Sequence, residues 1–299
     1  MKNFTIILAT IVVFWNVENF YDYFDSGQNA SDTEFSPSGT RHWTKKRFLA
    51  KCNAISKTIF HIADLKGSIP DIIAFAEVEN DFVLKKLIAE TSLRKTAYRI
   101  IHYDSRDHRG IDVALLYDAS RLNRVCSKPV STPVDSTRDI LLAQFTNNNG
   151  DSLAVLINHF PSKYGGSDKE DGRISAAKTI LQTRDSLVRA GWSHIIAMGD
   201  FNETPDETAC ALIGSRMTNL ATGVKNGDGT IKYNGKWELI DQAFVSEALV
   251  TNCSFEILYP SFLLEKDSAH SGMKPLRTFV GPKYNAGASD HLPICVAIQ

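Results

Sequence analysis

The sequence predicts one α/β domain built on mixed β-sheets, and three observations support this prediction. Short apolar or β-branched segments alternate with longer helical patterns along all 299 residues. The chain is 43% hydrophobic and 22% charged, which is a globular composition with ample material for a core. No repeat, low-complexity tract or linker interrupts it. We therefore expect a single domain over residues 1–299, with long loops gathered at one rim.

Strands are predicted where apolar or β-branched residues run between turn residues. In chain order they are Ile6–Trp15, Asp71–Ala76, Tyr98–His102, Val113–Tyr117, Ile140–Phe145, Leu153–Asn158, His194–Met198, Ile240–Val245 and Ile294–Ile298. Helices are predicted at Thr44–Ile62, Asp81–Thr91 and Gly172–Ala190, the last of which has apolar residues at near-helical spacing. Loops rich in Gly, Asn and Asp are predicted at Asp22–Ser38, Asn147–Asp151, Ser162–Asp171, Gly223–Gly235 and Ser268–Ala288.

The charge and cysteine content exclude few classes of function. With a formal net charge of −1, no overall basic field marks the chain as a nucleic-acid binder, although a local basic groove is compatible with that balance. The five cysteines are scattered without a Cys-x-x-Cys pair, which argues against a zinc site or a disulfide framework. We therefore expect buried free thiols.

The N-terminus has two interpretations. The apolar stretch MKNFTIILATIVVFW resembles the core of a signal peptide and is too short to span a membrane. It also runs without a spacer into Asn16, so cleavage after Ala9 or Thr10 would remove part of a strand that the predicted site requires. We expect an uncleaved first strand and a cytoplasmic protein, while the signal-like segment leaves export open.

Polar residues follow several of the predicted strands. They are Asn16, Glu77, Asn158, His159, Asp200, Asn202, Asp241, Asp290 and His291. Each alone has a structural explanation, such as a turn residue, a turn cap, a solvated loop acid or a hydrogen-bonded structural histidine. Because open α/β sheets bind ligands at the carboxyl ends of their strands, the whole set instead predicts one site at one rim.

The residue types suggest hydrolysis of phosphate esters. Carboxylates are the ligands that Mg²⁺ prefers, commonly one or two of them together with a phosphate. Two histidines, each oriented by a carboxylate, suit proton transfer near neutral pH. Asparagine side chains can donate hydrogen bonds to phosphate oxygens without adding charge. Together these residues predict metal-assisted hydrolysis with Mg²⁺ or Mn²⁺ as the cofactor.

A series of short motifs resembles those of the endonuclease/exonuclease/phosphatase superfamily, which includes deoxyribonuclease I, abasic-site endonucleases, sphingomyelinases and inositol-polyphosphate phosphatases. In chain order the motifs are WNVEN, EVEN, RGIDVALLYD, NHFPS, GDFN, IDQAFVS and SDHLP, and they extend from Trp15 to Pro293. GDFN and SDH are specific in this context, whereas NVEN or IDQ alone would be weak. The resemblance implies a four-layer α/β sandwich, with two mixed sheets packed face to face and helices outside.

The resemblance also implies where metal and phosphate bind. Glu77 resembles the principal metal ligand of the family, with Asn16 and Asp290 beside it. Asp200 and Asn202 resemble the pair that positions the attacking water and the phosphate.

The two histidines receive roles in the same way. His291, held by Asp241, resembles the general base or transition-state histidine, and His159 resembles its counterpart on the leaving-group side. Asn158, next to His159, is expected to contact the substrate. The deoxyribonuclease I branch pairs its first histidine with a glutamate. The nearest acid here is Asp112, which is therefore the expected partner of His159, with a solvent-facing strand acid as the alternative.

Basic residues give further indications of the substrate. Arg138 lies where the deoxyribonuclease I branch carries a phosphate-binding arginine, although a surface ion pair would also explain it. The stretch Arg41–Arg47 places four basic residues beside a tryptophan, a composition that suits a groove along a nucleic-acid backbone. A solvated helix start is the alternative for this stretch.

The resulting expectation is a Mg²⁺- or Mn²⁺-dependent phosphodiesterase, with nucleic acid as the favoured substrate. The alternatives are a phosphomonoesterase or a lipid- or inositol-phosphate phosphoesterase and, in another class, a catalytically silent binding protein on this fold. The intact set of acids and histidines argues against the silent protein. No stable protein partner is implied, and we expect a monomer.

Overall fold

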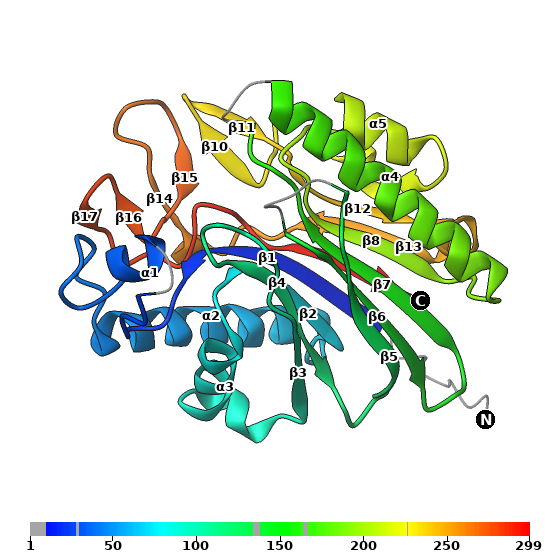
Figure 1. Cartoon of the computed structure of the whole chain (residues 1–299), viewed down its shortest axis with the longest axis horizontal. Helices are drawn as coiled ribbons and strands as arrows, with labels where there is room; N and C mark the ends of the chain where they lie inside the picture. The colour runs from blue at the N-terminus through cyan, green and yellow to red at the C-terminus, as the bar shows by residue number, and fades with distance from the viewer. Residues whose placement is uncertain (1–9, 28–29, 134–137, 164–166, 226) are drawn as a thin grey trace.

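The computed structural model describes residues 10–27, 30–133, 138–163, 167–225 and 227–299. Two six-stranded sheets lie face to face with helices on their outer faces, so the predicted four-layer α/β sandwich is confirmed (Figure 1). In spatial order, the first sheet contains β13 (Cys253–Ile257), β18 (Ile294–Ile298), β1 (Thr10–Phe20), β2 (Ile72–Val78), β4 (Asp112–Asp118) and β3 (Tyr98–His102). The second contains β5 (Leu122–Val130), β6 (Ile140–Asn147), β7 (Ser152–His159), β8 (Ile195–Asp200), β12 (Asp241–Val245) and β9 (Thr218–Asn219).

Helices cover the two outer faces of the sandwich (Figure 1). The first sheet is covered by α2 (Lys45–Lys66) and α3 (Asp81–Ala89), and the second by α4 (Ser167–Arg189) and α5 (Thr208–Gly214). A short helix and three small hairpins complete the rim: α1 (Ala30–Glu34), β10 (Ile231–Tyr233) with β11 (Lys236–Glu238), β14 (Leu264–Lys266) with β15 (Met273–Pro275), and β16 (Phe279–Val280) with β17 (Lys283–Tyr284). Single 3₁₀ turns occupy Ser92–Lys95, Leu220–Gly223, Glu247–Asn252 and Ser261–Leu263.

The apolar core forms three layers, because both faces of each sheet are covered. In β1, Phe14 points into the layer between the sheets, whereas Trp15 points toward α2. In β8, Met198 points between the sheets and Ala197 toward the outer helices. Successive residues of a strand point to opposite faces, so a strand that is buried on both faces needs an unbroken apolar run. This explains why the sequence marked these strands so clearly.

Local capping explains the limits of the predicted helices. The Thr44 side chain accepts the backbone N–H of Arg47 at the start of α2, and Gly67 ends that helix in the left-handed conformation, with φ of 74°. The Asn80 side chain accepts the N–H of Val83 and begins α3 in the same way. None of the helices in the described part of the chain is long and apolar enough to cross a membrane.

The structure corrects several boundaries. The predicted strand Ile6–Trp15 lies partly outside the described residues, and β1 continues to Phe20, so Asn16 lies inside the strand. The edge strand β5 and the helix α5 were not predicted. The expectation of buried thiols is wrong for Cys126, which is exposed on β5; the described cysteines are all free.

Candidate active site

The carboxyl ends of two parallel strand pairs meet at one rim of the sandwich. The strands β1 and β2 run parallel in the first sheet, and β7 and β8 run parallel in the second. Asp200 at the end of β8 is in register with His159 on one side and with Asp241 on the other. Because residues in register share a face of the sheet, these three side chains form a row at the rim.

Backbone irregularities turn side chains of the first sheet toward this row. The pairing of β1 with β2 shifts register between Asn16 and Phe20. Three residues at this bulge have left-handed conformations, namely Glu18 (φ 46°), Asn19 (φ 54°) and Glu77 (φ 63°). Such conformations are costly for residues other than glycine and are found where function requires a particular side-chain direction.

His291 lies beside two aspartates of the second sheet. Its Nδ1 is 2.8 Å from Asp241 Oδ2, and its Nε2 is 3.9 Å from Asp200 Oδ2. Its backbone N–H donates to Ser289 Oγ at 2.9 Å, and Trp15 Nε1 donates to its carbonyl at 2.9 Å. Burial opposes a charge on the ring, but nearby carboxylates, Asp241 foremost, outweigh burial and raise the pKa of His291 well above its ordinary value. A protonated ring fits the transition-state role that the resemblance implies better than the general-base role.

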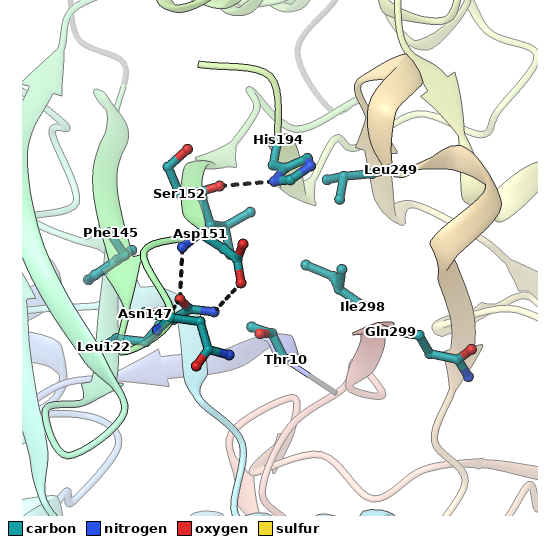
Figure 2. A pocket seen from close by; sticks show the side chains of 12 residues that line it. Thr10, Leu122, Phe145, Asn147, Asp151, Ser152, His194, Leu249, Ile298 and Gln299 are labelled. Atoms are coloured by element: carbon teal, nitrogen blue, oxygen red, sulfur yellow. Dashed lines mark hydrogen bonds between the residues drawn. The ribbon is translucent and has the colours of Figure 1, made fainter. Parts of the chain in front are cut away.

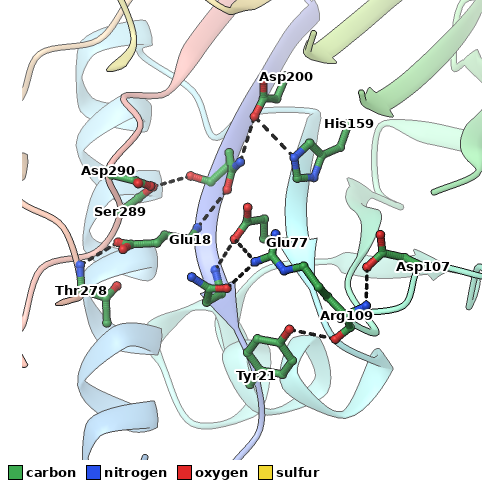
Figure 3. A network of polar contacts seen from close by, with 12 residues as sticks. Glu18, Tyr21, Glu77, Asp107, Arg109, His159, Asp200, Thr278, Ser289 and Asp290 are labelled. Carbon is green, nitrogen blue, oxygen red and sulfur yellow. Dashed lines mark hydrogen bonds and ion pairs between the residues drawn. The ribbon is translucent and has the colours of Figure 1, made fainter. Parts of the chain in front are cut away.

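His159 also lies beside Asp200 (Figure 3). Its Nε2 is 3.6 Å from Asp200 Oδ2, and its buried Nδ1 has no hydrogen-bond partner among the residues that the structure describes. Burial lowers the pKa of His159 well below its ordinary value, and the cations Arg138 and Arg109 lower it further. The pKa values of the two imidazoles beside Asp200 are therefore shifted in opposite directions. Such a pair can accept a proton at one position and donate a proton at the other.

Asp200 connects the two sheets at the centre of the row. Its Oδ2 accepts a hydrogen bond from Asn16 Nδ2 at 3.1 Å, and its Oδ1 accepts the N–H of Asn202 at 2.9 Å. Burial, followed by repulsion from Asp241, raises the pKa of Asp200 to about 7. Asn202 has φ of 51°, and its Nδ2 donates to the Phe160 carbonyl at 2.9 Å. The GDFN segment thus holds Asp200 and Asn202 together at the rim.

Glu77 is held as a carboxylate by neighbouring donors (Figure 3). Its Oε2 accepts the N–H of Asn19 at 2.7 Å and lies 3.5 Å from Arg109 Nη2. Burial favours the neutral form, but Arg109, Arg138 and the Asn19 N–H outweigh burial and lower the pKa of Glu77. Arg109 also donates to Asn19 Oδ1 at 2.6 Å, and its carbonyl accepts the Tyr21 hydroxyl at 2.9 Å.

A second group of charges lies beside Asp290. Arg277 Nη2 donates to Asp290 Oδ2 at 2.7 Å, and the Thr278 N–H donates to Glu18 Oε2 at 2.7 Å. The ammonium of Lys51, which is only 2% exposed, donates to the Glu18 carbonyl and to Thr278 Oγ1. Burial, followed by repulsion from Asp290, raises the pKa of Glu18 to about 7, and burial lowers the pKa of Lys51 to about 8.

The oxygen donors at this rim fit a hard divalent cation. Glu77 and Asp290 offer carboxylates, and Asn16 offers an amide oxygen, which are ligand types that Mg²⁺ and Mn²⁺ prefer. Both carboxylates act electrostatically on the same buried cation, Lys51, so they share one neighbourhood. The repulsion between Asp290 and Glu18 is an interaction that a bound cation would relieve. The donor chemistry therefore agrees with the predicted ligands.

Three groups of acids and histidines in the described residues lie close enough to share an ion. They are Asp200–Asp241–His291, Asp22–Asp32–Glu79 and His102–Asp104–Asp112. Glu77 and Asp290 belong to none of these groups, and each is paired with an arginine, Arg109 and Arg277 respectively. The Asn16 Oδ1 accepts the N–H of Glu18 at 3.0 Å, so a metal would use its remaining lone pair.

Arg138 contributes positive charge from the second sheet. Its side chain is buried, its Nη2 lies 3.4 Å from Asp107 Oδ2, and within the described part of the chain its Nε has no hydrogen-bond partner. Its charge lowers the pKa of both Glu77 and His159. A buried guanidinium that acts on two site residues is not the surface ion pair considered as the alternative. The placement supports the predicted phosphate contact.

Asn158 does not face the rim. Its side chain has no exposed surface, and its Nδ2 donates to the Met198 carbonyl at 3.0 Å. Because neighbouring residues of a strand point to opposite faces, Asn158 and His159 cannot both face one site. The structure therefore gives Asn158 a structural contact between β7 and β8 in place of the expected substrate contact.

The expected pair of Asp112 and His159 is not formed. Asp112 accepts hydrogen bonds from the N–H and hydroxyl of Ser105, and its Oδ2 lies 3.7 Å from His102 Nε2. Burial raises the pKa of Asp112 to about 7, so it is not a solvent-facing acid either. The prediction failed because Asp112 lies at the start of β4 beside the adjacent strand β3, where its carboxylate is engaged by Ser105 and His102.

The basic stretch Arg41–Arg47 is not a nucleic-acid platform. Trp43 has no exposed surface and packs in the core beneath α2. Arg41 Nε donates to Glu34 Oε1 at 2.7 Å, and the Arg47 guanidinium lies 4.3 Å from the centre of the Tyr284 ring. Two of the four cations and the tryptophan are thus used in packing.

Sequence reasoning missed several residues of the charge network. Glu18 lies two positions after Asn16, and strand alternation would have placed both on one face. Lys51 lies on the inner face of α2 between Phe48 and Ile55, where a lone lysine in an apolar stripe is a detectable signal. Arg109 and Arg277 are in loops. Arg109 begins the motif RGIDVALLYD, which is a signal for it, whereas no motif contains Arg277.

Two pockets differ in their relation to this site. One, of about 220 Å³, is lined by Thr10, Leu122, Ser152 and His194 among others (Figure 2). Thr10 and Ser152 begin β1 and β7, so this pocket lies at the rim opposite the acids and histidines. The other, of about 290 Å³, includes Asn202 in its lining and adjoins the site.

A two-sheet sandwich with acids and paired histidines at one rim is the fold of a class of phosphoesterases. The chain belongs to the endonuclease/exonuclease/phosphatase family, whose model matches residues 11–299. A search of curated proteins finds no match to the sequence.

Solved structures share the fold at low sequence identity. An endonuclease/exonuclease/phosphatase family protein from Bacteroides thetaiotaomicron has a TM-score of 0.64 at 15% identity, covering 97% of this chain and 94% of that chain. A mannosyl-6-phosphatase from the same organism has a TM-score of 0.62 at 14% identity, covering 97% and 99%. TDP2 from D. rerio, complexed with a single-strand DNA product, has a TM-score of 0.57 at 15% identity, covering 97% and 99%. At these identities the likeness establishes the fold and not the substrate.

Proposed function

We propose that the chain is a Mg²⁺- or Mn²⁺-dependent phosphodiesterase that acts on nucleic acid. The observation that carries the proposal is the pair of buried imidazoles beside Asp200, with His159 Nε2 at 3.6 Å and His291 Nε2 at 3.9 Å from the same oxygen. The leaving group of a diester is a poorly stabilised alkoxide, so its departure benefits from a positioned proton donor. A monoester with a good leaving group does not need this proton donor.

The chain's own residues would divide the work as follows. Asp241 orients His291, and Asp200 lies between the two imidazoles to position the attacking water. Asn202 and Arg138 would bind the phosphate oxygens from the second sheet. Glu77 and Asp290 would hold the cation, which when bound supplies a Lewis acid for the phosphate oxygens.

The structural neighbours are compatible with more than one class of substrate. TDP2 with its single-strand DNA product is compatible with a nucleic-acid substrate, and the mannosyl-6-phosphatase with a phosphomonoester. Purified protein should therefore be assayed with plasmid DNA, single-stranded DNA and RNA, sphingomyelin, inositol phosphates and a hexose 6-phosphate, each with Mg²⁺, Mn²⁺ or EDTA. We expect metal-dependent cleavage of nucleic acid.

The histidine variants identify the site responsible. His159→Ala should lower kcat on nucleic acid by about 10²–10⁴-fold, the usual effect of losing an acid–base group. His194→Ala is the matched control, because His194 lines the pocket at the opposite rim and should leave the rate unchanged. Turnover of a monoester or lipid without cleavage of any nucleic acid would contradict the proposal, as would wild-type rates for His159→Ala.

A further inference from the structure

The pocket beside Asn202 is continuous with the catalytic residues. Its volume is about 290 Å³, and its lining consists of Ser162, Lys163, Asn202, Ile231, Tyr233, Glu238 and Ile240. Ile231 of β10 forms a backbone bridge with His291, and the Leu292 N–H donates to the Thr230 carbonyl at 2.8 Å. Asp241 follows Ile240 directly in the chain. The hairpin β10–β11 therefore forms a wall that starts at His291 and ends beside Asn202.

The wall of this pocket is mainly apolar and carries an aromatic ring. Ile231 and Ile240 provide aliphatic surface, and the side chain of Tyr233 is 49% exposed. Exposed aromatic rings at the edge of a pocket bind flat apolar groups by stacking. A sugar or inositol ring, by contrast, needs several directed polar partners. Among the polar residues of the lining, Asn202 Nδ2 already donates to the Phe160 carbonyl, and Lys163 and Glu238 are paired with each other.

The charges of the pocket disfavour a second phosphate. Lys163 is the lining cation, and its Nζ lies 2.7 Å from Glu207 Oε2 and 3.8 Å from Glu238 Oε2. With two carboxylates around one ammonium, the local charge is negative. A ligand bearing an additional phosphate, such as an inositol polyphosphate, would be repelled from this position.

We propose that this pocket seats the nucleobase of the nucleotide next to the scissile phosphate, with the base stacked on Tyr233. The inference rests on the proposed function and adds to it a base-binding subsite on the Asn202 side. Stacking is tolerant of base identity because every base has an aromatic face, so the subsite would select nucleotides without selecting a sequence. Tyr233 and Ile231 then become specificity-determining residues that do not touch the reacting atoms.

Two chromogenic diesters test the subsite. Thymidine 5′-(p-nitrophenyl phosphate) carries a base, methyl p-nitrophenyl phosphate does not, and both release p-nitrophenolate. We expect wild-type protein with Mn²⁺ to prefer the thymidine ester in kcat/KM by about tenfold or more, mostly through KM. Tyr233→Ala should abolish most of this preference, whereas Tyr233→Phe, which keeps the ring, should retain it. Val188→Ala, on the exposed surface of α4, is the remote control.

Direct binding separates the subsite from catalysis. Thymidine 5′-monophosphate should bind wild-type protein more tightly than inorganic phosphate in calorimetry, and Tyr233→Ala should remove the difference. Equal preference for the two esters, or a preference that survives in Tyr233→Ala, would overturn the subsite while leaving the phosphodiesterase in place. Failure to hydrolyse either ester would overturn the proposed function, and the binding measurement would then still decide whether the pocket takes a base. Tighter binding of a hexose 6-phosphate than of thymidine 5′-monophosphate would also overturn the base-binding subsite.

Discussion

Asp241 is fully buried; its Oδ2 contacts His291 Nδ1 at 2.8 Å, and none of the described residues offers its Oδ1 a hydrogen bond. At the scale of single residues, the site is a set of such buried charges, each with a specific neighbour. Despite burial, the carboxylates around His291 raise its pKa, whereas burial and the neighbouring cations lower the pKa of His159. Replacing one member therefore changes the state of the others.

Asp241→Asn should test the positioning role of this carboxylate. The amide keeps the shape of the side chain but no longer stabilises a protonated His291, so kcat should fall by about 10²–10⁴-fold while KM stays close to wild type. Steady-state kinetics on a diester measures both constants. Asp64→Asn, on the exposed face of α2, is the matched control. A loss confined to KM would show that Asp241 contributes to binding and not to the orientation of His291.

The buried Lys51 should contribute to stability through its contacts at Glu18. In Lys51→Met, the Glu18 carbonyl and Thr278 Oγ1 lose their donor, and the buried carboxylate loses a nearby cation. The free energy of unfolding should fall by about 1–3 kcal/mol, the usual cost of leaving buried hydrogen-bonding groups without partners. Denaturant unfolding measures this, with Lys46→Met on the exposed face of the same helix as the control.

A double-mutant cycle separates the charge interaction from lost packing. Glu18→Gln together with Lys51→Met should cost less than the sum of the single substitutions, with a coupling of about 0.5–3 kcal/mol. Strict additivity would show that Lys51 acts only through packing.

The sequence predicted residues at strand ends better than residues in loops. Asp200, Asn202, Asp241 and His291 lie together as expected, because strand alternation and turn chemistry are local properties. Arg109 and Arg277 were missed, since their positions depend on how loops fold over the rim. The partner of His159 was mispredicted for a related reason, because Ser105, in the loop before β4, engages the carboxylate of Asp112.

At the scale of elements, the short distance between β7 and β8 brings the neighbouring site residues His159 and Asp200 together. A Cβ at Gly199 would lie 2.2 Å from the Asn158 carbonyl oxygen and 2.7 Å from its Oδ1. These two residues directly precede Asp200 and His159 in their strands. Only glycine therefore allows the parallel pair to approach as it does at the rim.

Gly199→Ala should thus both destabilise the protein and disturb the site. Overpacking of this kind costs about 1–3 kcal/mol, and separation of β7 from β8 should also lower kcat. Gly214→Ala is the matched control, because a Cβ there meets nothing within 4 Å. Thermal melting and activity of the two variants provide the comparison. Equal melting temperatures would mean that the strands adjust without cost.

Elements buried on both faces were predictable, and edge elements were not. The strands β7 and β8 appear as unbroken apolar runs between turn residues. The strand β5 has the sequence LNRVCSKPV, is mostly exposed and contains a proline, so neither alternation nor propensity marks it. The hairpin β10–β11 has three residues in each strand, too few for a periodic pattern, although it forms the wall beside Asn202.

At the scale of the whole molecule, the site exists only where the two sheets pack together. Asn16 of the first sheet donates to Asp200 of the second, and the Ser289 hydroxyl donates to the Asn16 carbonyl at 2.6 Å. Metal ligands are expected mainly from one sheet and the acid–base residues mainly from the other. We propose that the metal ligands of one sheet and the acid–base residues of the other form one metal-dependent phosphodiesterase site.

The most direct measurement is the rate of bis(p-nitrophenyl) phosphate hydrolysis against Mn²⁺ concentration for wild type, Glu77→Gln and Glu170→Gln. We expect a saturable dependence on metal, loss of activity in excess EDTA, and a fall of about 10²-fold or more in Glu77→Gln. Glu170→Gln, on the exposed surface of α4, should follow the wild-type curve. Full activity in EDTA would contradict metal dependence, and a wild-type curve for Glu77→Gln would contradict the role of Glu77 as a metal ligand.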